Sequence, residues 1–252
     1  MKDRVKGNAW LYNAAGGCAN GRLRLVCFPP VGGSSSFFRT WLDAKLDGIE
    51  ICAVQLPGRE ERLEERPFGQ LRPLIQALVP FIPQDKPFAF FGHSMGALVA
   101  FELARELRRQ GLPGPQGLFV SAAPAPQLPL QPARYSLPDR EFAEALRLLG
   151  GTAELILTDV ALLAYFMPVL RADFEVVDTY EYLAGEPLDC PIHVFGGEND
   201  LEVNHEGLRS WEVQTHGEFK LQIFPGEHFY LLSAWPALIA AICSDLRVSC
   251  YV

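Results

Sequence analysis

The chain has 252 residues, of which 49% are hydrophobic, 11% aromatic and 21% charged, and its formal net charge is −8. This composition is typical of a globular protein that buries a core, and it excludes intrinsic disorder over most of the length. The acidic balance provides no basic surface, so we expect no nucleic-acid partner. With domains of about 150 residues as a guide, the length favours one large domain with an insertion.

The sequence indicates a soluble protein of the reducing cytoplasm. Residues 1–17 lack the continuous apolar core of a signal peptide. No run approaches the roughly 18 apolar residues of a membrane span, so we expect no membrane partner. The six cysteines form no C-x-x-C pair and none has metal-ligand spacing to a histidine, so we expect no metal site: they are Cys18, Cys27, Cys52, Cys190, Cys243 and Cys250. Of these, Cys27, Cys52 and Cys190 lie at or beside apolar strand-like runs, where a cysteine usually behaves as a small buried hydrophobe.

Stretches typical of strands alternate with stretches typical of helices along the chain. In order, we expect a strand at 22–28, a helix at 37–45, a strand at 49–55, a helix at 71–81, a strand at 87–91, a helix at 97–110, strands at 118–123, 191–195 and 219–224, and a helix at 230–246. This alternation predicts an α/β fold in which a mostly parallel central sheet carries helices on both faces.

About sixty residues separate the expected strands at 118–123 and 191–195, which is too long for a simple crossover. The segment opens with the proline-rich run at 123–138, which cannot hold a regular helix because proline lacks an N–H. Helical patterns follow near 139–149 and 159–182. We interpret residues 124–185 as a helical lid inserted into a single domain spanning 1–252. This lid would cover the C-terminal edge of the sheet, where α/β proteins bind ligands, and a simple packing appendage is the alternative.

The clearest chemical motif is G-x-S-x-G at residues 92–96, between a short apolar strand and a helix. That context predicts a nucleophile elbow, in which Ser94 occupies a sharp turn at the positive end of the following helix. The turn needs small neighbours, which Gly92 and Gly96 supply. An ordinary strand-to-helix turn is the alternative.

A serine hydroxyl needs a general base, and His228 is the best placed of the five histidines. His228 follows the last expected strand and precedes the last helix. His93 lies inside the elbow and we expect it to be structural, while His193 lies within a strand and is expected in the core. His205 and His216 fall in polar segments that resemble protein surface.

The acid that orients the base should follow an earlier strand, in the order Ser, Asp/Glu, His. Asp200 ends the run GGEND after the strand at 191–195 and precedes His228 by 28 residues. Its carboxylate would accept a hydrogen bond from the imidazole and stabilise the imidazolium. Glu198 and Glu202 are close rivals, and each could instead be a solvated loop charge.

Two backbone amides should stabilise the oxyanion. One is the amide of Met95, and the other should come from the loop after the first motif strand. In that loop Pro29 and Pro30 have no N–H, so Val31 supplies the first available amide. The same loop could also be an ordinary turn whose serines, residues 34–36, cap the next helix, and the two interpretations are compatible.

Six motifs in order resemble those of the type II thioesterases of polyketide and nonribosomal peptide biosynthesis, a branch of the α/β-hydrolase superfamily. They are FPPVGGSSSFF, VQLPGREER, FFGHSMGA, LRADFEVVDTYEY, GGENDLEV and PGEHFYL, and they span nearly the whole chain. The resemblance implies an α/β-hydrolase fold and hydrolysis of acyl or aminoacyl thioesters. The substrate would be held on the phosphopantetheine arm of acyl or peptidyl carrier proteins, and the groups removed would be wrongly loaded or stalled. No cofactor of its own is implied.

Carried over residue by residue, the resemblance gives Ser94 as nucleophile, Asp200 as acid and His228 as base. Met95 and Val31 become the oxyanion donors. The family often has FPHAGG where this chain has Pro30 and Val31 in place of His and Ala. This departure leaves the triad untouched and concerns the shape of the acyl entrance.

Several other residues could have either of two roles. Leu149, Phe166 and Met167 could line the acyl site, although packing within the lid is the commoner role of such residues. Arg59 and Glu60 match the family motif LPGRE, and we expect a surface or structural ion pair there. Three arginines on the helix at 97–110 could meet an acidic carrier protein or form a solvated face, namely Arg105, Arg108 and Arg109.

Two other functional classes remain open from the sequence. A general carboxylesterase or lipase would share the triad but cleave oxygen esters. A binding protein built on an inactive hydrolase scaffold would lack a member of the triad, whereas this sequence has all three.

Overall fold

The computed structural model describes residues 2–4, 8–14, 21–44, 46, 48–129 and 131–248. Cys18, Cys250 and the expected helix end at Lys45 lie outside these residues. The described chain forms an eight-stranded sheet in the order β1-β2-β4-β3-β5-β6-β7-β8. The strands are β1 (Lys2–Arg4), β2 (Leu11–Ala14), β3 (Leu23–Phe28), β4 (Ile49–Val54), β5 (Phe88–His93), β6 (Leu118–Ser121), β7 (Ile192–Gly197) and β8 (Phe219–Phe224).

All neighbouring strands from β4 through β8 pair in parallel, and β1 and β2 add an antiparallel edge. Every residue of β3, β4, β5, β6 and β7 is buried, as expected for parallel strands covered on both faces. This confirms the predicted fold class. Because the strands are parallel, the loops after their carboxyl ends gather at one edge of the sheet.

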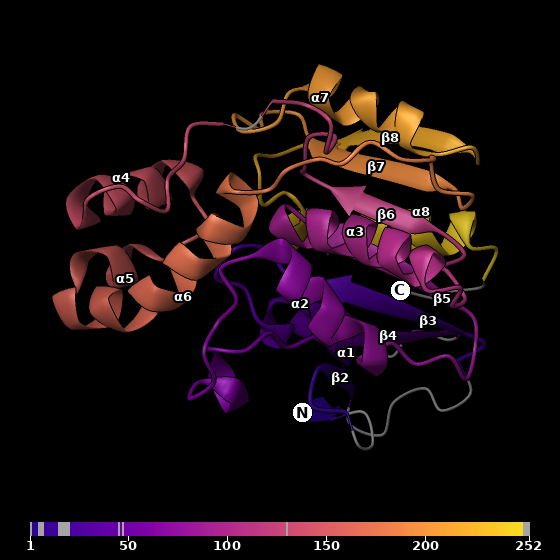
Figure 1. Cartoon of the computed structure of the whole chain (residues 1–252), viewed down its shortest axis with the longest axis horizontal. Helices are drawn as coiled ribbons and strands as arrows, with labels where there is room; N and C mark the ends of the chain where they lie inside the picture. The colour runs from indigo at the N-terminus through magenta and orange to yellow at the C-terminus, as the bar shows by residue number, and fades with distance from the viewer. Residues whose placement is uncertain are drawn as a thin grey trace.

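Helices cover both faces of the sheet (Figure 1). They are α1 (Arg39–Asp43), α2 (Leu71–Leu78), α3 (Met95–Arg109), α4 (Asp139–Leu149), α5 (Glu154–Thr158), α6 (Val160–Asp178), α7 (His205–Arg209) and α8 (Leu231–Asp245), with 3-10 helices η1 (Ser35–Phe38), η2 (Glu60–Arg62), η3 (Val79–Phe81) and η4 (Ser210–Gln214). Alternate strand residues point to opposite faces. Val26 and Phe90 pack in one core with α2 and α3, whereas Leu25 and Phe91 pack in a second core with α1 and α8.

Helices α4, α5 and α6 lie between β6 and β7 in the chain and form a group to one side of the sheet (Figure 1). They have a small apolar core of their own, which includes Phe142, Leu157 and Phe174. The proline-rich run that precedes them contains no helix among its described residues. This agrees with the loss of backbone donors at proline.

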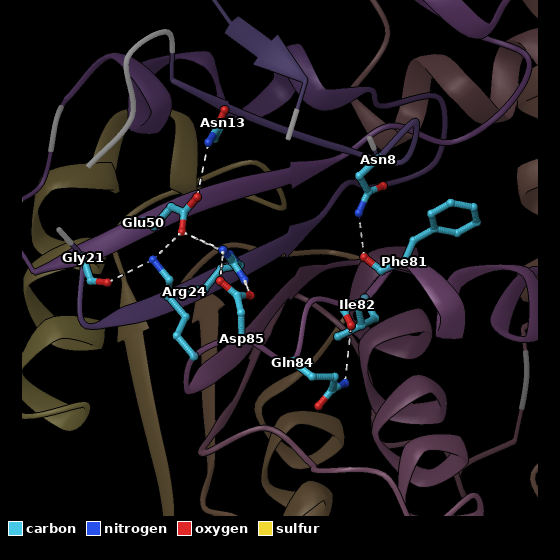
Figure 2. Close-up of polar contacts among 10 residues, drawn as sticks. Asn8, Asn13, Gly21, Arg24, Glu50, Phe81, Ile82, Gln84 and Asp85 are labelled. Atoms are coloured by element: carbon cyan, nitrogen blue, oxygen red, sulfur yellow. Dashed lines mark hydrogen bonds and ion pairs between the residues drawn. The ribbon is translucent and has the colours of Figure 1, made fainter. Parts of the chain in front are cut away.

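A polar cluster lies at the amino-terminal edge of the parallel strands (Figure 2). Arg24 near the start of β3 pairs with Glu50 near the start of β4 at 2.9 Å and with Asp85 at 2.7 Å. Glu50 also accepts a hydrogen bond from Asn13 of β2. The cluster therefore ties the antiparallel edge to the parallel strands, at the end opposite to the loops that follow them.

The structure corrects several expected elements. Helix α3 begins at Met95 rather than at residue 97, and α6 ends at Asp178 rather than at 182. Strands β1 and β2 and the short helices α5 and α7 were not predicted, because elements of three to five residues carry too little periodicity. Within the described residues, no helix combines the length and the apolar character needed to cross a membrane.

Candidate active site

Ser94 occupies the turn between β5 and α3 with φ 54° and ψ −120°, a backbone conformation that is uncommon for any residue with a side chain. The turn is tolerated because its neighbours have no Cβ. A Cβ added to Gly92 would lie 2.2 Å from the carbonyl oxygen of Gly96, and one added to Gly96 would lie 2.1 Å from that of Phe28. The predicted need for both glycines is confirmed. The geometry is that of a nucleophile elbow.

Asp200 and His228 meet across the loops that follow β7 and β8. His228 Nδ1 lies 2.9 Å from Asp200 Oδ2, and because a carboxylate only accepts, the imidazole donates through Nδ1. The other carboxylate oxygen accepts from the backbone amides of Glu202 and Val203 at 2.9 and 3.2 Å. Both side chains are nearly buried, with exposures of 1% for Asp200 and 10% for His228. This arrangement leaves Nε2 of His228 as the nitrogen that can act as a base.

The two rival acids have other environments. Glu202 pairs with Arg134 at 2.6 Å, and Glu198 is exposed to solvent. Neither is the carboxylate that contacts His228 in the structure. The choice of Asp200 over its rivals therefore agrees with the observed contacts.

His93 is a fully buried neighbour of the base. Its Nδ1 lies 2.9 Å from the hydroxyl of Ser121, which in turn lies 2.7 Å from the hydroxyl of Tyr230. Its ring centroid is 5.2 Å from that of His228. Burial lowers the pKa of His93 well below its ordinary value, and the charge of His228 lowers that pKa further. His93 is thus a neutral side chain that is hydrogen-bonded through Nδ1 and packs beside the base, consistent with the structural role expected for it.

The remaining histidines agree with their expected environments. His193 is buried within β7, with its Nδ1 2.5 Å from Asp245 of α8. His205 and His216 are exposed. Of the five histidines, His228 alone combines contact with an acid and a place at the carboxyl edge of the sheet.

The loop after β3 forms a tight turn at residues 30–33. The amide of Gly33 donates to the carbonyl of Pro30 at 2.9 Å, and Gly32 has φ +68°. Val31 is the second residue of the turn, so its own amide takes no part in the hydrogen bond that closes it. Met95 is the first residue of α3, where an amide has no partner within the helix. Both predicted oxyanion donors therefore lie where a free amide is expected.

One cavity of about 370 Å³ joins these groups, and Ser94, His228, Met95 and Val31 all line it. This is the volume of a small-molecule site. Most of its remaining lining is apolar and comes from helix α3, the loops after the strands and the inserted helices, and it includes Leu98, Leu146, Leu149, Leu170, Phe174 and Phe229. The cavity is suited to a substrate with a hydrophobic part next to the serine.

The inserted helices contribute to the cavity in part as expected. Leu149 lines it, whereas Phe166 and Met167 pack against the core of the insertion. The turn before α5 also approaches the base, because a Cβ added to Gly151 would lie 2.2 Å from the ring of Phe229. The insertion thus contacts the loop that carries His228.

The arginines on α3 have structural partners. Arg105 donates to the carbonyl of Leu183 at 2.5 Å, and Arg108 donates to those of Glu186 and Pro187 at 2.5 and 2.6 Å. These bonds fasten the segment after α6 to α3. Arg109 is exposed and pairs with Glu106 at 2.5 Å. The solvated-face interpretation therefore fits Arg109, whereas Arg105 and Arg108 bind backbone carbonyls.

Arg59 of the LPGRE motif forms a structural ion pair, one of the two roles expected for this motif. Its partner is Asp173 of α6 at 2.7 Å, and both side chains are buried. Asp173 was not singled out from the sequence. The signal was its place in the motif LRADFEVVDTYEY, but 114 residues separate the partners, and no local pattern indicates such a contact.

The chain is similar to known proteins over almost its whole length. The profile of the family described as "Thioesterase domain" matches residues 23–246. The gramicidin S biosynthesis protein GrsT of Aneurinibacillus migulanus is 42% identical over 244 residues, which cover 96% of this chain and 95% of that protein. Thioesterase PikA5 of Streptomyces venezuelae is 36% identical over 230 residues, which cover 90% of this chain and 80% of that protein.

Solved structures give the same picture. The type II thioesterase BorB from the borrelidin biosynthetic cluster superposes with a TM-score of 0.85 at 33% identity, over 98% of this chain and 100% of that one. The RedJ thioesterase from the prodiginine biosynthetic pathway in Streptomyces coelicolor superposes with a TM-score of 0.84 at 38% identity, over 90% of this chain and 91% of that one.

Proposed function

We propose that this chain, which belongs to the thioesterase domain family and is a thioester hydrolase, clears aberrant or stalled acyl and aminoacyl groups from carrier proteins of a polyketide or nonribosomal peptide synthase. The observation that carries the proposal is the cavity shared by Ser94 and His228, with Asp200 bonded to the imidazole behind it. The relatives named for antibiotic biosynthesis supply the substrate class.

In the proposed mechanism, Ser94 Oγ attacks the thioester carbonyl while Nε2 of His228 takes its proton. The carbonyl oxygen becomes an oxyanion, and the amides of Met95 and Val31 stabilise it. His228 then protonates the departing phosphopantetheine thiol, which leaves an acyl group on Ser94. Water then attacks the acyl carbonyl while His228 takes its proton, the bond to Ser94 Oγ breaks, and His228 returns the proton to Oγ as the free acid leaves. The enzyme needs no cofactor of its own, because the phosphopantetheine arm belongs to the carrier protein.

The setting fits this assignment. Carrier-bound intermediates are made where the synthases are, so we propose a cytoplasmic enzyme whose partner is a holo carrier protein. The apolar cavity would receive the acyl group while the arm enters from the rim. The same triad could cleave oxygen esters, and that activity is the alternative to be tested.

The test is mass spectrometry of carrier proteins loaded with acetyl, longer acyl and aminoacyl groups, before and after incubation with the enzyme. The expected result is conversion to the free phosphopantetheine form, and Ser94→Ala should abolish it. A matched ester and thioester of one acyl group would separate the alternatives, since an esterase would prefer the ester. If a fluorophosphonate does not label Ser94, this chain is a binding protein rather than an enzyme.

A further inference from the structure

A buried ion pair links the inserted helix α6 to the loop that carries Val31. Arg59 Nη1 lies 2.7 Å from Asp173 Oδ2, and Nη2 lies 2.8 Å from Oδ1, so the guanidinium binds the carboxylate with two parallel bonds. The side chains are only 6% and 3% exposed. This geometry fixes the direction of both groups as well as their distance.

The same two side chains bind the backbone of the loop after β3. Asp173 Oδ2 accepts from the amide of Gly32 at 2.8 Å, and Arg59 Nη1 donates to the carbonyl of Gly33 at 3.0 Å. Leu170, one turn before Asp173, packs on Gly32 so closely that a Cβ there would lie 2.6 Å from its Cδ2. Helix α6 therefore touches the loop through both a charge and an apolar contact.

These bonds determine the orientation of the Val31 amide. A peptide unit is planar, with its N–H and C=O pointing in opposite directions. The bond from Gly33 to the carbonyl of Pro30 orients the plane that contains the N–H of Val31. Asp173 orients the next plane through the N–H of Gly32. The Val31 amide is thus held by bonds on both sides of it.

Other residues of the segment after β4 hold the same loop farther along. Gln55 accepts from the amide of Ser35 at 3.0 Å and donates to the carbonyl of Arg59 at 3.0 Å. Glu60 accepts from the hydroxyls of Ser34 and Ser36. The motif VQLPGRE therefore supports the loop from one side, and Asp173 and Leu170 of the insertion support it from helix α6.

A role in packing alone does not account for this pair. Removing two charges from water is costly, and apolar residues of similar volume often stabilise a protein as well as a buried ion pair does. Apolar residues, however, could not bind the amide of Gly32 and the carbonyl of Gly33. The pair is the means by which the turn acquires a single orientation.

We propose that Arg59 and Asp173 are positioning residues for the oxyanion site, which preset the Val31 amide and make this setting depend on helix α6. The inference rests on the proposed function, because it assumes that the Val31 amide binds the oxyanion. Since Asp173 lies on α6, the turn is oriented only while α6 is seated against it. The insertion then has a part in the chemical step in addition to enclosing the acyl group.

The test compares Asp173→Asn and Arg59→Lys with the wild type, using an acyl-pantetheine thioester as substrate. Loss of one oxyanion donor costs about 10²- to 10³-fold in kcat, so we expect kcat to fall by up to that factor while KM changes by less than about threefold. An acyl trifluoromethyl ketone, which forms a tetrahedral adduct on Ser94 with a developed oxyanion, should bind more weakly by the same factor. A non-hydrolysable thioether of the substrate should bind as before.

The matched control is Glu50→Gln in the Arg24–Glu50 pair, whose side chains are 5% and 9% exposed and which lies at the opposite end of β3 and β4 (Figure 2). It should lower the melting temperature without changing kcat or ketone affinity. Arg59→Lys keeps the positive charge but loses the planar fork, so it tests the same geometry if Asp173→Asn does not fold.

Folded variants with wild-type kcat and wild-type ketone affinity would overturn the proposal. A KM increase with unchanged kcat would also overturn it, since that pattern indicates a role in substrate binding. If the wild type fails to cleave thioesters, the proposed function is wrong. The ketone measurement still reports on the oxyanion site in that case, because the adduct needs only Ser94 and the oxyanion donors and no cleavage of a thioester.

Discussion

Asp200→Asn is the substitution whose effect on catalysis follows most directly from the observed contacts. The carboxylate has two different sets of partners: Oδ2 accepts from His228, and Oδ1 accepts from the amides of Glu202 and Val203. An asparagine of the same shape has one accepting oxygen and one donating NH₂ group. It can satisfy only one of the two sets.

The more favourable orientation of the asparagine is the inactive one. If its NH₂ faced the two backbone amides, donors would oppose donors, and each buried amide left without a partner costs about 1–3 kcal/mol. The NH₂ group therefore turns to His228 and donates to Nδ1. The imidazole must then carry its proton on Nε2, the nitrogen that should accept the proton of Ser94.

We expect kcat to fall by about 10⁴-fold, which corresponds to about 5.5 kcal/mol of transition-state stabilisation, with weak activity remaining because the oxyanion amides survive. The assay is thiol release from an acyl-pantetheine thioester near neutral pH, with circular dichroism to show that the fold is intact. Glu198→Gln and Glu202→Gln serve as controls and should stay within a few-fold of the wild type. An Asp200→Asn variant with activity close to the wild type would refute the assignment of the acid.

Three further predictions concern stability and reactivity. Gly96→Ala should lower the free energy of unfolding, measured in urea, by about 3 kcal/mol or more, because its Cβ would lie 2.1 Å from a backbone oxygen. The control Gly114→Ala places a Cβ where no atom lies within 4 Å, so it should change that free energy by less than about 0.5 kcal/mol. Equal losses in the two variants would contradict this. His93 has a folded-state pKa below its ordinary 6.5, so below that pH the unfolded chain binds more protons than the folded chain does. Stability should then decline by up to about 1.4 kcal/mol per pH unit, and His93→Asn should remove this part of the slope in urea titrations at several pH values; identical slopes would count against it. Burial raises the pKa of Cys52 to about 12, so iodoacetamide at mildly alkaline pH should alkylate it only after unfolding. Mass spectrometry measures the rate of alkylation, and a native protein alkylated at Cys52 as fast as the unfolded chain would disprove this.

The strands of the sheet were predictable because buried parallel strands are short apolar runs with turn residues at both ends. The run at 219–224 is β8 with the same bounds, and the run at 118–123 contains β6, which ends two residues earlier at Ser121. Strands β1 and β2 could not be found this way. Strand β2 is stabilised by a ladder to β4 and by the contact of Asn13 with Glu50, which join residues distant in the sequence, and β1 pairs with β2.

The candidate site likewise has one part that the sequence predicts and another that it does not. Ser94, Asp200 and His228 each follow a strand, and because the carboxyl ends of parallel strands share one edge, their proximity could be inferred from strand order alone. The contact between Arg59 and Asp173 follows from no such rule. It depends on where the inserted helices settle on the domain, and that placement is determined by packing across loops of the insertion rather than by any local pattern.

The two candidate oxyanion amides are supported in physically different ways, and this difference decides where catalysis can change without loss of the fold. The amide of Met95 belongs to the first residue of a 15-residue helix packed in the main core, so moving it would require displacing the helix. The amide of Val31 belongs to a four-residue turn oriented by side chains of two other segments. Substitutions in those segments can reorient one donor while the sheet and its helices stay in place. We therefore expect the substitutions that change kcat without unfolding the protein to lie mainly in the segments that orient the Val31 amide.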